Sequence, residues 1–233
     1  MASRFDGSAP AVVWIVGVVN AGHCWLNFPA SPGGKDYPNV LFTGLEGNEA
    51  YLDLFDQRGV KVWLQVEPAG ADVSTLIDLV LGRYASHPSV VGFGIDGEWY
   101  KNREDPDGKA VTDAEAQAWV TQVRSYNPKY LFFAKHWLPE KMPPTYRDGM
   151  MFLDDSQQFE SLAAMVDEFQ AWGRTFAPAP VGFQYGYPDD KKWWGNFADP
   201  PGEIGRALAS KIPNLSDLYW VDFTAQEIWP QEE

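Results

Sequence analysis

The chain has 233 residues, with 32 acidic and 18 basic side chains and a formal charge of −14. This charge argues against binding to nucleic acid and against docking on anionic membranes, because both need a surplus of Lys and Arg. Hydrophobic residues make up 45% of the chain, so disorder over its whole length is excluded. The length predicts one domain over residues 1–233.

The longest apolar run, residues 9–19, is too short for a membrane-spanning helix, which needs about 20 residues. It also lacks the basic region and the cleavage site of a signal peptide, so we expect no membrane insertion. Cys24 is the single cysteine and cannot form an internal disulfide. The cellular location stays open, with secretion slightly preferred to the cytoplasm.

Short runs rich in Val, Ile, Phe, Tyr and Trp, bounded by Gly, Pro or Asp, predict strands. Eight such runs follow one another along the chain, at residues 12–19, 39–43, 60–66, 90–96, 130–135, 150–153, 181–185 and 218–223. Several of them lack polar alternation, which is typical of a parallel sheet covered on both faces.

Apolar residues at helical spacing predict helices between most of these strands, at residues 48–58, 72–84, 112–126, 159–172 and 202–211. The third helix begins with a capping box, Thr112 followed three residues later by Glu115. Strands that alternate with helices predict an α/β fold, a compact single (β/α)8 TIM barrel with some helices shortened or replaced by loops. An open doubly wound sheet is the alternative, but no glycine-rich phosphate loop follows the first strand.

In such a barrel the active site lies at the carboxyl ends of the strands. The residues that follow these ends are acidic, polar or aromatic, and we expect substrate contacts from Glu67, Trp99, Trp137, Gln184, Tyr185, Trp220 and, earlier in the chain, Trp25. The chain also holds 11 Trp, 10 Tyr and 14 Phe, enough to build a groove that stacks sugar rings as well as a core. Carboxyl groups beside aromatic rings are typical of glycosidases, in which one carboxyl protonates the leaving oxygen and a second group stabilises or attacks the sugar cation.

The strongest motif is Asp96-Gly97-Glu98, at the end of the fourth predicted strand. Residues two apart on a strand point to the same side, so we expect Asp96 and Glu98 to face the barrel mouth together. Two such carboxyls repel when both are ionised, which predicts that one pKa rises and that Glu98 keeps a proton to donate. In the alternative interpretation both side chains only cap the following loop.

The fourth predicted strand fits part of the pattern D-x-x-D-x-D-x-E, with Val91 and Gly94 at the first two acidic positions and Asp96 and Glu98 at the last two. This stretch resembles the family 18 glycoside hydrolases, the chitinase-like (β/α)8 barrels. The resemblance implies a substrate-assisted mechanism, in which Glu98 protonates the glycosidic oxygen. Asp96 would orient the N-acetyl group, whose carbonyl oxygen attacks the anomeric carbon.

Two further motifs extend the resemblance. Residues 151–154, Met-Phe-Leu-Asp, are similar to the M-x-Y-D motif of that family, with Leu for Tyr, and Trp220 matches the Trp that floors its sugar site. The resemblance implies that Asp154 is catalytic and that, with Tyr185, it holds the N-acetyl group. The sequence therefore predicts a hydrolase of a polysaccharide or an aminosugar polymer, with a carbohydrate as its partner and no cofactor or metal.

Other arrangements remain open. A retaining enzyme would need a nucleophile after the seventh strand, where the nearest acids are Asp189 and Asp190, a pair expected on the solvated surface. An inverting enzyme would pair Glu98 with Glu67 or Asp154 as base. A barrel that binds carbohydrate without turnover is the competing class. Two less favoured alternatives are a metal site that uses Asp154, Asp155, Glu67, Asp222 and His136, and a Schiff base on Lys135, a residue expected to pair with Glu98 or Asp154.

Overall fold

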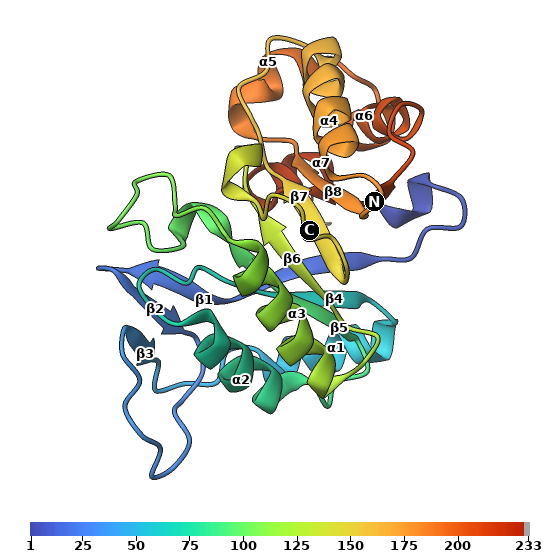
Figure 1. Ribbon diagram of the computed structural model, residues 1–233. Helices are drawn as coiled ribbons and strands as arrows, with labels where there is room; N and C mark the ends of the chain where they lie inside the picture. The colour runs from blue at the N-terminus through green and yellow to red at the C-terminus, as the bar shows by residue number, and fades with distance from the viewer. Residues whose placement is uncertain (231–233) are drawn as a thin grey trace. The chain divides into compact units, whose positions relative to one another are not determined.

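The computed structural model describes residues 1–230, and residues 231–233 lie outside the described part. The fold divides into two compact units (Figure 1). We call Ala9–Met150 the amino-terminal unit, and Met1–Ser8 with Met151–Glu233 the carboxyl-terminal unit. Among the described residues, no helix combines the length and apolarity that a membrane span needs. The single domain expected over residues 1–233 stays a prediction.

Six strands form the sheet of the amino-terminal unit. They are β1 (Ala11–Asn20), β2 (His23–Leu26), β3 (Val40–Phe42), β4 (Lys61–Val66), β5 (Val90–Asp96) and β6 (Leu131–Lys135), in the order β3-β2-β1-β4-β5-β6. β1, β4, β5 and β6 run parallel to one another, β2 is antiparallel to β1, and β3 is parallel to β2. The predicted fold class is confirmed as mixed α/β with mostly parallel strands.

The described residues hold nine strands rather than the predicted eight, and the difference arises after β1. The chain reverses there at Ala21 and Gly22, whose φ angles are 49° and 81°. Positive φ at both central residues is the geometry of a tight hairpin turn, so β2 folds back onto β1 where a barrel would need a crossover. The predicted strand over residues 39–43 exists as β3, but it pairs with β2, not with β1.

Three helices cover one face of this sheet: α1 (Glu49–Arg58), α2 (Val73–Tyr84) and α3 (Asp113–Tyr126) (Figure 1). The capping box of α3 is confirmed, with the Thr112 and Glu115 side chains bonded to each other's backbone. Side chains buried between the helices and the sheet include Leu64, Phe93, Phe132, Leu76, Ile77, Val80, Trp119 and Val123. Two 3-10 turns, η2 (Gly97–Trp99) and η3 (Pro139–Lys141), follow β5 and β6.

The carboxyl-terminal unit contains three parallel strands, β7 (Met150–Asp154), β8 (Val181–Tyr185) and β9 (Leu215–Trp220). Its helices are α4 (Leu162–Phe176), α5 (Lys191–Trp194), α6 (Pro200–Ala209) and α7 (Ala225–Ile228), with 3-10 turns η1 (Ala2–Arg4), η4 (Pro188–Asp190) and η5 (Asp222–Thr224). The strand predicted over residues 218–223 is found three residues earlier, as β9, and the chain turns into η5 after Trp220. Stacked rings fill the core, with Phe169 and Phe183 centred 4.3 Å apart.

Candidate active site

The face of the amino-terminal sheet that is turned away from its helices carries the polar side chains. Trp119 of α3 packs on Phe132 of β6, so Phe132 points towards the helices. Side chains alternate along a strand, so Phe133 and, by register, Gly94 and Gln65 belong to the opposite face. Two residues further along each strand, towards the carboxyl ends, polar side chains follow on neighbouring strands.

Two glycines on β5 allow an aromatic floor beneath these polar residues. A Cβ on Gly94 would lie 2.3 Å from the ring of Phe133, and one on Gly92 would lie 2.5 Å from the ring of Trp63. Only glycine leaves room for both rings over the strand. The two rings meet edge to face, with centroids 5.9 Å apart. The glycines thus allow both rings to lie against β5.

Above this floor, Asp96 at the end of β5 and Lys135 at the end of β6 form an ion pair. They are partners in the parallel register, and Lys135 Nζ lies 2.7 Å from Asp96 Oδ2. The two side chains are only 4% and 10% exposed, respectively. A lysine at this distance favours the ionised carboxylate. Asp96 is thus one partner of Lys135, and the pairing of Lys135 with Glu98 or Asp154 expected from the sequence stays a prediction.

Glu98 lies beyond the end of the strand. β5 ends at Asp96, and Glu98 falls within η2, where it is half-buried. The prediction that Glu98 points to the same side as Asp96 assumed that the strand continues to residue 98. Because the strand ends before Glu98, the alternation of side chains along β5 does not determine where Glu98 points. Asp96 has a buried cation beside it, and the expected sharing of one proton between Asp96 and Glu98 stays a prediction. The catalytic roles of both residues stay predictions.

Glu67, directly after β4, supplies a third ionisable group. Its Oε2 accepts a hydrogen bond of 2.7 Å from the backbone N–H of Val19. Burial raises the pKa of Glu67, against the opposing effects of the Val19 N–H and the charge of Lys135. A carboxyl with a raised pKa is a stronger base than a free glutamate, which suits it to proton transfer. Glu67, Asp96 and Lys135 thus gather at the carboxyl ends of β4, β5 and β6.

Of the three predicted aromatic contacts in this unit, two lie on segments that follow strands and one lies within a strand. Trp99 and Trp137 are half-buried, and Trp25 is exposed on β2. His136 supports the loops: its Nδ1 accepts from the backbone N–H of Leu138 at 2.9 Å, which leaves Nε2 to donate to the Asp107 carbonyl at 2.7 Å.

The remaining predicted residues belong to the carboxyl-terminal unit. Asp154 ends β7 and is buried, its Oδ1 accepting from Ser156 N at 2.8 Å, and burial raises its pKa well above the usual range. Tyr185 is fully buried and donates its hydroxyl to the Pro201 carbonyl at 2.9 Å. Their substrate roles stay predictions, although the Tyr185 hydroxyl is already used within the fold.

Gln184 and Trp220 are half-buried in the same unit. Trp220 lies with its ring against Gly186, where a Cβ would be 2.4 Å away, and donates Nε1–H to Thr224 Oγ1 at 2.9 Å. Asp190 was expected on the solvated surface but is fully buried. Its Oδ1 accepts a hydrogen bond of 2.6 Å from Phe159 N, which compensates for the loss of water. A loop acid that holds another loop by its backbone is not recognisable from the sequence.

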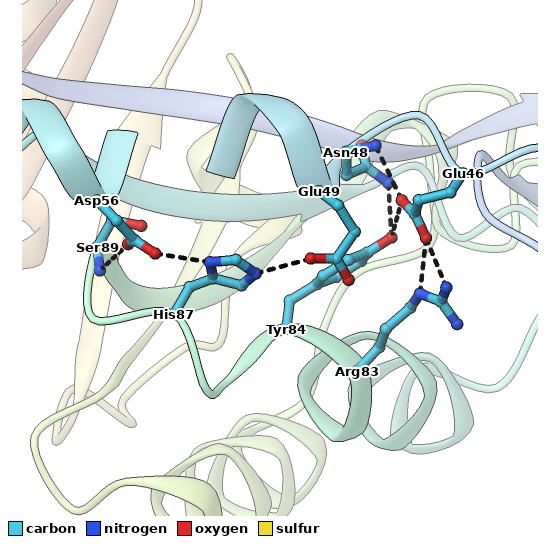
Figure 2. A network of polar contacts seen from close by, with 8 residues as sticks. All are labelled: Glu46, Asn48, Glu49, Asp56, Arg83, Tyr84, His87 and Ser89. Carbon is cyan, nitrogen blue, oxygen red and sulfur yellow. Dashed lines mark hydrogen bonds and ion pairs between the residues drawn. The ribbon is translucent and has the colours of Figure 1, made fainter. Parts of the chain in front are cut away.

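A second ionic cluster lies away from these strand ends, on α1 and the turn after α2 (Figure 2). His87 Nδ1 lies 2.7 Å from Asp56 Oδ2, and Nε2 lies 3.0 Å from Glu49 Oε2. Asp53, Asp56 and His87 form the one group among the described residues whose spacing could suit a metal ion. Both ring nitrogens already face carboxylates, so an imidazolium bridging two acids accounts for the geometry. The metal ligands considered from the sequence do not form such a group within residues 1–230.

No protein-family model matches the sequence, and no curated protein sequence matches it. Solved structures are similar in fold. An FMN-binding beta-glucuronidase from Facaelibacterium prausnitzii L2-6 has a TM-score of 0.53 and 14% identity, covering 78% of this chain and 31% of that protein. A beta-D-glucuronidase from Dictyoglomus thermophilum has a TM-score of 0.50 and 11% identity, covering 75% of this chain and 36% of that protein.

A family 5 glycoside hydrolase from Prevotella bryantii B14 has a TM-score of 0.47 and 10% identity, covering 99% of this chain and 94% of that one. This chain spans about a third of the two glucuronidases. The likeness to the two glucuronidases shows a shared fold alone, and it does not support the chitinase-like family suggested by the motifs.

Proposed function

We propose that this chain is a glycoside hydrolase. The observation that carries the proposal is the gathering of Glu67, Asp96 and Lys135 at the carboxyl ends of three consecutive parallel strands, with Glu98 on the turn that follows. Carboxyl ends are where barrels of this class keep their active sites. The fold likeness to glucuronidases supports the same reaction class. A TIM barrel and a polysaccharide or aminosugar substrate remain part of the proposal.

In the proposed mechanism Glu98 is the general acid that protonates the glycosidic oxygen. Asp96 stays ionised beside Lys135 and stabilises the positive charge that develops on the sugar ring. Glu67, with its raised pKa, is the second candidate for proton transfer, as the base that activates water. A substrate-assisted route, with Asp96 orienting an N-acetyl group, uses the same two residues.

The test is Glu98→Gln assayed on two aryl glycosides with good and poor leaving groups. Loss of a general acid is expected to lower turnover about 100-fold or more on the poor leaving group, and much less on the good one, which needs little protonation. Glu104→Gln, which changes an exposed carboxyl on the nearby loop, is the matched control. Equal turnover by Glu98→Gln and the parent on both substrates would remove Glu98 from the mechanism.

A carbohydrate-binding protein without turnover is the second candidate. The buried ion pair favours it in one respect, because Asp96 held by Lys135 also fits a purely structural role. This candidate predicts glycan binding with no reducing ends released at any pH. Reducing-end detection across a polysaccharide panel separates the two.

A further inference from the structure

Three exposed apolar side chains form a row across β1, β2 and β3. Val18 pairs with Trp25 in the antiparallel register, and Trp25 pairs with Leu41 in the parallel register. Registered partners on neighbouring strands point to the same face. The three side chains are 45%, 38% and 43% exposed, whereas their strand neighbours Cys24 and Val40 are buried. We call Val18, Trp25 and Leu41 the apolar row.

The apolar row lies on the same face of the sheet as the candidate active site. A Cβ on Gly17 would contact Cys24, Leu26 and Val66, so these residues face the helix side. Alternation then turns Val18 to the other side, the side of Gln65 on β4. The backbone N–H of Val19, next to Val18, donates to Glu67 at 2.7 Å. The row is thus continuous with the carboxyl ends of the strands.

A polar row runs beside the apolar one. Asn20 and His23 are registered partners, each two residues from a member of the apolar row and therefore on the same face. Asn20 is exposed and His23 is half-buried. Neither row contains a Lys, Arg, Asp or Glu side chain. A flat apolar strip with hydrogen-bonding side chains along one edge complements a pyranose, which has an apolar ring face and a rim of hydroxyls.

We propose that the apolar row is a binding subsite for a neutral, extended glycan that continues into the candidate active site. Neighbouring strands lie about 4.8 Å apart, so the row spans about 10 Å, the length of roughly two sugar rings. Trp25 at its centre stacks one ring. The inference rests on the proposed function in taking a glycan as the ligand, and it makes the substrate a polymer held beyond the bond that is cleaved.

A second copy of the chain is a less fitting occupant. β3, at the edge of the sheet, is three residues long, which is a short template for pairing with another strand. The net charge of −14 also opposes self-association. The apolar row is therefore assigned to a ligand rather than to a dimer interface.

The test is affinity electrophoresis of the full chain carrying Glu98→Gln, in native gels with mixed-linkage glucan, xylan, glucomannan, glycol chitin or polygalacturonate. We expect retardation by at least one neutral polysaccharide. Adding Trp25→Ala should weaken the apparent affinity about tenfold, equivalent to 1.4 kcal/mol, while Trp25→Phe should keep most of it. Tyr126→Ala, on an aromatic side chain of similar exposure (37%), is the matched control and should not change retardation.

Binding and turnover are separate readouts, so the two proposals fail separately. A Glu98→Gln chain that turns over normally yet is retarded through Trp25 contradicts the catalytic proposal and leaves the subsite standing. No retardation by any neutral polysaccharide, or equal retardation of Trp25→Ala, overturns the subsite. A parent that is dimeric in sedimentation and a Trp25→Ala variant that is monomeric also overturn it. If Trp25→Ala unfolds, Val18→Thr with Leu41→Thr repeats the test.

Discussion

His87→Ala is expected to destabilise the amino-terminal unit in a pH-dependent way. The His87 ring lies between Asp56 and Glu49 and holds α1 to the turn before β5 (Figure 2). Its side chain is 10% exposed. Burial lowers the pKa of His87, but the hydrogen bonds and charges of Asp56 and Glu49 outweigh it and raise the pKa above 6.5. The imidazolium is therefore the form that the fold stabilises.

The magnitude follows from the exposure of the two partners. Asp56 is 19% exposed, and a hydrogen bond to a charged group of that kind contributes roughly 1.5–3 kcal/mol. Glu49 is 44% exposed, so its ion pair is discounted to about 0.2–1 kcal/mol. Together they give an expected loss of about 2–4 kcal/mol in the free energy of unfolding while His87 is protonated.

The sign of the pH dependence follows from the raised pKa of His87. Its contribution is complete below pH 6.5, the value of the unfolded chain, and is lost as the pH rises through the higher folded value. Urea unfolding followed by tryptophan fluorescence, from pH 5.5 to 9, measures the difference between parent and His87→Ala. That difference should be largest at pH 5.5–6.5 and shrink at alkaline pH. A difference that is constant with pH would refute the reasoning, and His23→Ala serves as the control.

Two further substitutions test the packing around the candidate residues. Lys135→Met removes the cation 2.7 Å from Asp96 and should lower the free energy of unfolding by about 3–5 kcal/mol. Adding Asp96→Leu to the same chain should restore most of that loss. Equal urea midpoints for the parent and Lys135→Met would contradict this expectation. Gly186→Ala should lower the free energy of unfolding by about 1–3 kcal/mol, because the φ of 92° disfavours a side chain and the new Cβ would lie 2.4 Å from Trp220. An unchanged near-ultraviolet circular dichroism spectrum would show that Trp220 had not moved, against this expectation.

Local patterns predicted the regular elements well, because each depends on neighbouring residues. The capping box at Thr112 starts α3 as expected, and the apolar runs correspond to strands. β2 escaped prediction because it is four residues long and its turn, Ala21-Gly22, differs from the common Asn-Gly and Asp-Gly turns. That hairpin also changes the pairing of β3 from the one a closed barrel requires.

The positions of the acids in the candidate site could be predicted from the sequence, but the ion pair of Asp96 could not. Placing acids at strand ends requires only the strand boundaries, and Glu67 and Asp96 follow from them. The charge partner of Asp96 depends instead on the register between β5 and β6, which brings in Lys135 from a distant part of the chain. Adjacency in the sequence predicts a proton shared between Asp96 and Glu98, whereas the register places Lys135 beside Asp96, and a cation there favours the ionised carboxylate. We therefore expect the pH dependence of turnover to report the proton on Glu98 or Glu67.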